Sequence, residues 1–226
     1  MACLAVAHLD VAYRGKSAHA SASPEQGINA ADALTVAQVG VGLLRQHITG
    51  TDRIHGIVTD GGDAPNIVPE RTSGKWYIRS RTLASLAELE PKVHRCFEAG
   101  ALATGARLEI VPASPPYSEF AHDLDMVAVY RRNVEALGRH PVDIPRELAE
   151  RSAGSTDMAN ISLAIPSIHP MLGLDSLPAV NHQPEFAAFC ATPKADQAVV
   201  DGATAMAWTT IDLATDESQR QRLMAR

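Results

Sequence analysis

The hydrophobic pattern at the start of the chain changes from a period of two to a period near 3.6. Residues 4–14 alternate apolar with polar or small positions, as Val11 and Tyr13 illustrate, which is typical of a half-buried β-strand. The Ser-Pro-Glu run at 23–25 indicates a helix start, because serine caps helices well and proline does no harm at the first helical position. The spacing of apolar residues predicts a long helix over about 24–47.

The pattern downstream predicts three more strands and a second helix. Residues 53–59, 75–81 and 106–111 suit strands, and apolar residues at helical spacing predict a helix over 83–104. Pro91 is expected to bend this helix or to move its start. The resulting order, β-α-β-β-α-β, is that of a ferredoxin-like split unit with four antiparallel strands and two helices on one face. The sequence therefore predicts an α+β fold.

A proline-rich run, PASPP, follows the last predicted strand and marks the clearest boundary in the chain. It divides the sequence into a first domain at 8–112, a second segment at 113–215 and a charged tail at 216–226 that is expected to fray. The second segment and the tail therefore lie outside the predicted β-α-β-β-α-β unit.

The second segment is not expected to be self-contained. It offers a helix over 123–137 and a last helix over about 192–213, whose apolar residues cover most of its circumference and predict burial. Short apolar runs at 162–168 and 171–173 suit strands, but no series of parallel strands is present to build a sheet on.

Composition and charge narrow the class of protein. The 226 residues are 46% apolar and 20% charged, which is ordinary for a globular chain. A formal net charge of −6 argues against nucleic acid or an anionic membrane as the main partner, and no apolar run is long enough to span a bilayer. Cys3, Cys96 and Cys190 show no zinc or redox spacing, so a reducing cytoplasm is expected.

Four motifs in a fixed order carry a family resemblance. They are G-K-S-A-H-A at 15–20 followed by P-E-Q-G-I-N-A-A-D-A, G-G-D-A-P-N-I-V-P-E at 61–70, G-S-T-D-M-A-N at 154–160 and N-H-Q-P-E-F at 181–186. Together they resemble the metallo-amidohydrolase and metallopeptidase family of aminoacylase, carnosinase-type dipeptidases and aminobenzoyl-glutamate hydrolase. The first two motifs are nearest to its aminobenzoyl-glutamate hydrolase and β-alanyl-lysine dipeptidase branch.

The resemblance implies a particular architecture. Residues 8–112 would be the family's lid and dimerisation domain, and 113–215 the C-terminal portion of an α/β zinc-peptidase-like catalytic domain. The N-terminal half of that domain, which precedes the lid in the family, has no counterpart in this sequence. We therefore expect a homodimer formed through the lid and a chain that is inactive by itself.

His19 lies in a loop among small residues that would let a substrate approach. On local sequence it is either a solvated loop histidine or a hydrogen-bond donor to a developing negative charge. The resemblance implies the second role, stabilisation of the tetrahedral oxyanion, often in the site of the neighbouring subunit.

Three further positions are candidates for substrate binding. Asn66 is held between two prolines and is either a turn residue or a ligand contact. Arg79 is either a solvated strand residue or, as the resemblance implies, the group that binds the substrate carboxylate; Arg81 is the alternative, and Arg79 is preferred. The run beginning Gly154-Ser155 is either a helix cap or the family's substrate-proximal loop, and Ala159 stands where the family pattern usually has glycine.

His182 is either a hydrogen-bonded loop histidine or, as the resemblance implies, one ligand of a two-zinc site in which manganese is also possible. The resemblance places the remaining ligands and the glutamate general base before the lid, so His182 is expected to lack its partner ligands here.

The expected function is metal-dependent hydrolysis of amide bonds in N-acyl amino acids or small dipeptides. The alternative is a non-catalytic, truncated remnant that acts as a dimerising lid module. A third possibility, a ferredoxin-like small-molecule sensor, leaves residues 113–215 unexplained.

Overall fold

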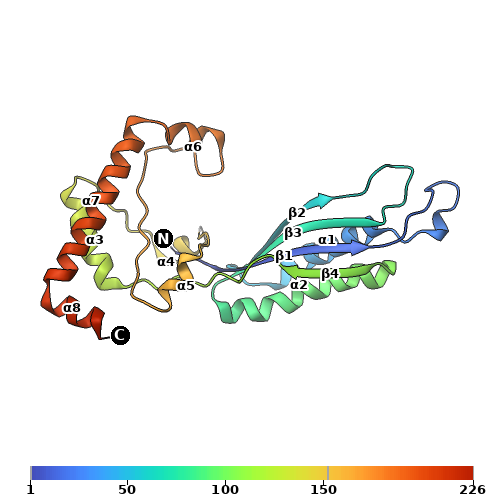
Figure 1. Ribbon diagram of the computed structural model, residues 1–226, viewed down its shortest axis with the longest axis horizontal. Helices are drawn as coiled ribbons and strands as arrows, with labels where there is room; N and C mark the ends of the chain where they lie inside the picture. The colour runs from blue at the N-terminus through green and yellow to red at the C-terminus, as the bar shows by residue number, and fades with distance from the viewer. Residues whose placement is uncertain (1, 152, 226) are drawn as a thin grey trace. The chain divides into compact units, whose positions relative to one another are not determined.

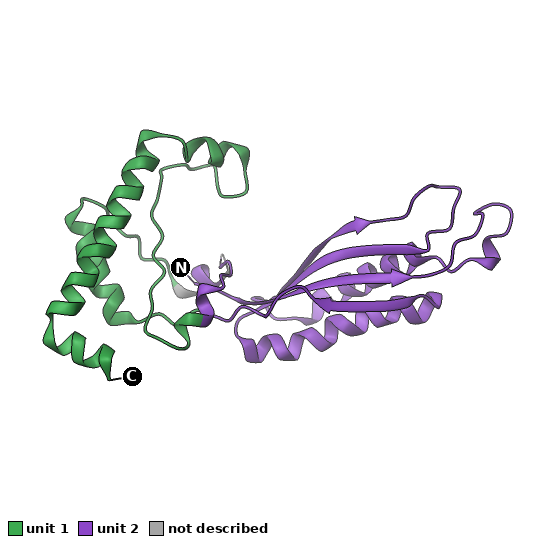
Figure 2. Cartoon of the chain, in the orientation of Figure 1, with its two compact units in different colours: residues 1, 120–146, 161–226 green, residues 2–119, 147–160 purple. Residues whose placement is uncertain are grey.

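The computed structural model describes residues 2–151 and 153–225, which form two compact units (Figure 2). The sheet unit comprises residues 2–119 and 147–160, and the helical unit comprises residues 120–146 and the chain from residue 161 onward. Residues 147–160 thus belong to the sheet unit, although they are separated in sequence from residues 2–119.

The sheet unit follows the β-α-β-β-α-β order, with two short 3₁₀ helices flanking the first α-helix (Figure 1). Its elements are β1 (Ala5–Arg14), η1 (Pro24–Gln26), α1 (Ala30–Leu44), η2 (Arg45–His47), β2 (Arg53–Asp60), β3 (Arg71–Ser80), α2 (Leu83–Thr104) and β4 (Arg107–Pro112). Two short helices, α4 (Arg146–Arg151) and α5 (Met158–Ser162), lie at the ends of its second segment.

The four strands form one antiparallel sheet in the order β2-β3-β1-β4. This confirms the predicted α+β class with a four-stranded antiparallel sheet. Helices α1 and α2 cover one face of the sheet (Figure 1).

The core lies between the sheet and this pair of helices. Alternate residues of β1 are buried, and β3 turns Trp76 and Ile78 inward, because successive strand residues point to opposite faces. The Tyr13 hydroxyl donates to the backbone oxygen of Phe97 at 2.8 Å, so the phenol is satisfied inside the core. The two helices approach closely at Gly100, where an added Cβ would lie 2.2 Å from the backbone oxygen of Ala33.

The starts of α1 and β3 differ from the sequence prediction, whereas the start of α2 agrees with it. The first α-helix begins at Ala30, because the Asn29 side chain accepts from two amides there, whereas Ser23 makes no side-chain cap and starts only η1. Helix α2 begins at Leu83 as the spacing predicts, because Thr82 and Ser85 form a reciprocal capping box there, and Pro91 does not move this start. Strand β3 begins four residues earlier than predicted because it pairs with β1 along its whole length.

The helical unit is built mainly from α3 and α7, which pack through Tyr130, Val134 and Ala205. Its elements are α3 (Leu124–Ala136), α6 (Pro184–Phe189), α7 (Pro193–Thr215) and α8 (Glu217–Met224). The predicted strands at 162–168 and 171–173 are wrong: within the described residues this region makes only an isolated bridge between Ser167 and His122.

The burial predicted for the last helix is also wrong. Apolar side chains of α7 remain largely exposed, with Val199 71%, Met206 54% and Ile211 57% accessible. The buried stripe consists instead of small residues and Leu213. Helix α7 packs against α3 and against Ile168 and Leu172, and this surface covers only part of its apolar circumference among the described residues.

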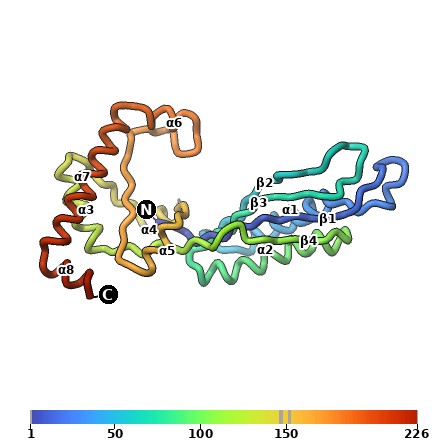
Figure 3. The backbone as a smooth tube through the Cα atoms, in the orientation of Figure 1, coloured from blue at the N-terminus to red at the C-terminus, as the bar shows by residue number. Residues whose placement is uncertain are grey.

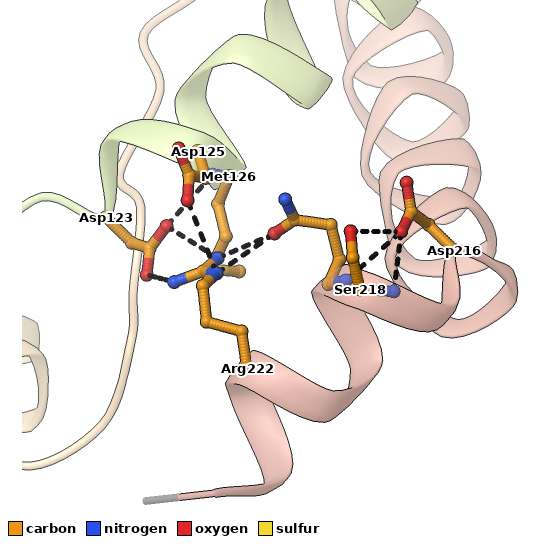
Figure 4. A network of polar contacts seen from close by, with 7 residues as sticks. Asp123, Asp125, Met126, Asp216, Ser218 and Arg222 are labelled. Atoms are coloured by element: carbon orange, nitrogen blue, oxygen red, sulfur yellow. Dashed lines mark hydrogen bonds and ion pairs between the residues drawn. The ribbon is translucent and has the colours of Figure 1, made fainter.

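Most of the charged tail, which was expected to fray, forms helix α8. Asp216 caps α8 by accepting from the amides of Ser218 and Gln219. The Arg222 guanidinium donates to both carboxylate oxygens of Asp123 at 2.6 and 3.0 Å, and Asp123 also caps α3 by accepting from the Met126 amide (Figure 4). One carboxylate therefore joins the start of α3 to α8.

Across the described ranges, none of the helices has the length and hydropathy needed to cross a bilayer. Of the three cysteines, Cys3 is buried, Cys96 is partly exposed and Cys190 is exposed.

Candidate functional site

His19 lies in the loop that leads from β1 to η1, and its side chain is exposed. The ring nitrogen Nδ1 accepts from the backbone amides of Ser21 and Ala22 at 3.3 and 3.2 Å. An imidazole nitrogen that accepts carries no proton, so these two amides select the neutral tautomer protonated at Nε2. The loop thus presents an N–H donor at the outer nitrogen of the ring.

Asn66 lies in the loop between β2 and β3, which runs beside the His19 loop (Figure 3). Three contacts join the loops: Ala20 donates to the Asn66 backbone oxygen at 2.9 Å, Val68 donates to Ala18 at 2.9 Å, and His19 bridges to Ile67. In the described part of the chain the Asn66 side-chain amide makes no hydrogen bond, so it is available to a ligand. The structure therefore brings two predicted residues together as an exposed polar pair.

Arg79 lies near the opposite end of β3, on the sheet face away from the helices. Its Nη1 donates to Ser155 Oγ at 2.7 Å, and that hydroxyl donates to the backbone oxygen of Leu4 at 2.7 Å. The Leu4 amide donates to the Gly154 oxygen at 2.8 Å, which fixes the Gly154-Ser155 segment alongside the start of β1. The structure thus joins the three predicted residues Arg79, Gly154 and Ser155.

Burial lowers the pKa of the Arg79 guanidinium, although an arginine remains charged at any physiological pH. The guanidinium carbon lies 5.7 Å from the centre of the Tyr77 ring, and Nε donates to His55 Nε2 at 3.2 Å. The alternative, Arg81, instead pairs with Glu150 at 3.4 Å. Arg79 is therefore a cation held from several sides, as recognition of a carboxylate requires.

His55 was missed by the sequence reasoning. It lies on β2 and reaches Arg79 because Arg53 and Arg79 are cross-strand partners, which sets His55 diagonally opposite Arg79 on the same face. That proximity depends on the β2–β3 register, which the sequence pattern does not specify.

The two groups of predicted residues do not meet within one chain. The His19 and Asn66 loops lie beyond the Arg71 end of β3, and Arg79 lies eight residues further along that strand. At a strand rise of about 3.3 Å per residue this separates the groups by roughly 26 Å. A small amide substrate cannot span such a distance.

His182 lies in the helical unit, in the turn before α6, with a left-handed φ of 70°. Among the described residues there is no group of three or more His, Cys, Asp or Glu side chains that could hold a metal ion. Those residues therefore do not fit a two-zinc centre by themselves. Among them, His182 has no second and third ligand beside it with which to hold a metal ion.

The chain has recognisable relatives, although no family model matches it. The Xaa-Arg dipeptidase of Mus musculus is 34% identical over 205 residues, which cover 90% of this chain and 47% of that protein. One of the subunits of the p-aminobenzoyl-glutamate hydrolase of Escherichia coli (strain K12) is 32% identical over 98 residues, or 43% of this chain and 20% of that protein.

The fold has counterparts among solved structures as well. The aminobenzoyl-glutamate utilization protein of Klebsiella pneumoniae matches with a TM-score of 0.55 and 23% identity, over 70% of this chain and 40% of that one. This chain spans about half the length of the Xaa-Arg dipeptidases it matches. The resemblance expected from the four motifs is confirmed: the homologues are a dipeptidase and an aminobenzoyl-glutamate hydrolase subunit.

Proposed function

We infer that this homologue of the Xaa-Arg dipeptidases and of p-aminobenzoyl-glutamate hydrolase acts in the hydrolysis of amide bonds in small dipeptides or N-acyl amino acids. The sheet unit serves as a lid that carries substrate-binding groups, and the helical unit is the C-terminal portion of a catalytic domain. The odd number of cysteines and their lack of zinc or redox spacing favour a reducing cytoplasm as its location.

One observation carries the proposal that the active form is a homodimer. His19 and Asn66 lie at one end of the sheet and Arg79 with Ser155 at the other, roughly 26 Å apart by strand rise. A substrate of a few residues can contact both groups only if they come from different chains. Two lids in opposite orientations would place the His19 loop of one subunit at the Arg79 end of its partner.

Each group has a distinct chemical role in this site. The Nε2–H of His19 donates to the oxyanion that forms when water attacks the scissile carbonyl. The Asn66 amide holds the carbonyl side of the substrate, and the Arg79 guanidinium, braced by Ser155, binds the substrate carboxylate. The Gly154-Ser155 backbone lies next to that carboxylate.

The catalytic centre requires further protein besides this chain. The exposed apolar face of α7, with Val199 and Ile211, has the character of a surface that another part of the enzyme covers. His182 contributes one imidazole to a zinc or manganese centre whose other ligands come from outside the described residues. The chain is therefore expected to be inactive alone.

Sedimentation velocity on the whole chain tests the dimer. We expect the dimer to predominate at high micromolar concentration. Joining the chain to the part of an Xaa-Arg dipeptidase that it does not match then tests hydrolysis of dipeptides. A dimer without hydrolysis in that hybrid would favour the non-catalytic lid module, and a monomer would contradict the shared site.

In the same hybrid enzyme, Arg79→Ala should raise KM for a dipeptide by about ten- to a hundred-fold, because a charge-assisted hydrogen bond to the substrate carboxylate is lost in the ground state too. Lys75→Ala is the matched control, since Lys75 lies on the same strand and face. A dipeptide amide, which lacks the carboxylate, should be hydrolysed equally by Arg79→Ala and by the unaltered enzyme. A KM for the dipeptide that Arg79→Ala leaves unchanged would remove Arg79 from the site.

A further inference from the structure

Three ring side chains line up across the sheet face opposite α1 and α2. His8 and His55 are both cross-strand partners of Tyr77, with ring centres 4.3 and 5.6 Å from the tyrosine ring. Arg79 comes two residues after Tyr77 on the same face, and its Nε donates to His55 Nε2 at 3.2 Å. His55 is therefore the one member of the row with a hydrogen bond to the guanidinium.

This hydrogen bond determines the protonation state of His55. A guanidinium nitrogen can only donate, so His55 Nε2 must offer a lone pair and the proton must reside on Nδ1. Protonating Nε2 would replace the acceptor by a donor and place two cations in contact. The bond therefore exists only while His55 is neutral.

The surroundings of His55 favour the neutral form. Partial burial lowers the pKa of His55 first, and the positive charges of Arg79 on β3 and Arg45 on η2 lower it further. Arg45 is held nearby because its Nη2 donates to the Ile54 backbone oxygen at 2.8 Å. Tyr77 also faces His55 with its ring, and two more cations lie on this face of the sheet: Arg53, two residues before His55 on β2, and Lys75, two residues before Tyr77 on β3. His8 lies across Tyr77, where it contacts the Tyr117 ring and bonds to Ser114 Oγ at 2.7 Å.

The same bond limits how Arg79 can receive a carboxylate. Nε is taken by His55 and one N–H of Nη1 by Ser155, while Nη2 has no partner in the described ranges. The side edge of the guanidinium, formed by Nε and Nη2, is therefore closed to a bidentate ligand. Nη2 and the second N–H of Nη1 remain for a ligand.

We propose that His55 is a positioning residue for Arg79: in its neutral form it orients the guanidinium so that a ligand carboxylate is bound end-on, and protonation of His55 releases that orientation and weakens binding. This inference rests on the proposed role of Arg79 in carboxylate recognition. It adds a residue that does not touch the substrate and a pH dependence that Arg79 alone would not have.

The protonation state is tested by long-range ¹H–¹⁵N NMR on the whole chain. At pH 7.5 we expect His55 Nε2 to resonate as an unprotonated nitrogen, and Arg79→Ala to raise the pH at which His55 titrates because a neighbouring positive charge is removed. A proton on Nε2 at pH 7.5, or an unchanged titration in Arg79→Ala, would overturn the inference.

Binding is tested with N-acetylglycine, with N-acetylglycinamide as the probe that lacks a carboxylate. Between pH 7.5 and pH 5.5 the affinity of the unaltered chain for N-acetylglycine should fall by about three- to ten-fold. Protonation of His55 breaks its hydrogen bond to Arg79 and places a second positive charge beside the guanidinium, in a site that is partly exposed. His55→Gln should bind at pH 7.5 with similar affinity but without this pH dependence, because the amide oxygen accepts from Arg79 and does not titrate. His47→Gln, at an exposed histidine of η2, is the matched control and should retain it.

The outcomes separate the two claims. An unchanged pH dependence in His55→Gln would overturn the positioning role. Failure of N-acetylglycine to bind at either pH would remove the proposed carboxylate role of Arg79, and with it the end-on binding inferred here. In that case the NMR measurement would still show whether His55 orients the guanidinium.

Discussion

His19→Ala is expected to lower kcat by about 100- to 1000-fold in the hybrid enzyme, with little change in KM. The Nε2–H of His19 is oriented as a donor by two backbone amides that occupy Nδ1. An oxyanion donor meets full negative charge only in the transition state, so its loss falls on the chemical step. His19→Gln, which keeps a side-chain N–H donor, should recover part of the lost kcat.

Mixing two impaired variants, assayed with substrate well below KM, tests whether His19 acts on the partner subunit. Dimers that combine a His19→Ala chain with an Arg79→Ala chain contain one site in which both residues are intact. Random exchange of subunits should therefore restore about one quarter of the activity of the unaltered enzyme. Activity that stays at the level of the separate variants would place His19 and Arg79 in the same chain's site, against the separation along β3.

Phe97→Ala is expected to lower the free energy of unfolding of the sheet unit by about 3–5 kcal/mol. The ring is fully buried at 0% exposure and lies 5.3 Å from the ring of Trp76 in an edge-to-face contact. Its removal leaves a cavity between α2 and the sheet, while the backbone oxygen that Tyr13 uses is retained. Urea unfolding followed by Trp76 fluorescence, in a Trp208→Phe background, measures the change.

Leu102→Ala is the control for Phe97→Ala. Leu102 lies further along α2 but is 88% exposed, so its truncation should change stability by less than about 0.5 kcal/mol. Similar losses from both variants would contradict the assignment of Phe97 to the core.

The hydrophobic pattern was sufficient for the two central strands, β1 and β3, because alternate residues of each are buried. The alternation around Val11 and Tyr13 predicts β1 correctly, and that of β3 predicts the inward direction of Trp76. Helix starts were less predictable, since they depend on which side chain reaches the first amides. Ser23 has the preferred residue type, but Asn29 makes the bonds.

The predictions that failed in the second half depended on what surrounds an element. An apolar helix surface predicts burial only if something covers it, and α7 keeps residues such as Val199 exposed. Likewise, the run at 162–168 has strand composition but no neighbouring strand to pair with among the described residues.

The candidate residues could be selected by motif, but their arrangement could not. Whether His19 presents Nε2 or Nδ1 depends on two backbone amides that follow it. The contacts of Arg79 depend on strand register for His55 and on a residue 76 positions away for Ser155. The assignments of all these residues to catalysis or binding stay predictions.

The carboxylate of Asp123 makes the helical unit tolerant of extension at its end but intolerant of trimming. Its side chain is only 7% exposed, and it binds both the first turn of α3 and the guanidinium of Arg222, which lies 99 residues away in sequence. Residues added after α8 leave this pair in place. Proteolysis before Arg222 removes the positive charge that pairs with the nearly buried Asp123 carboxylate. A cut in α8 is therefore expected to destabilise the first turn of α3.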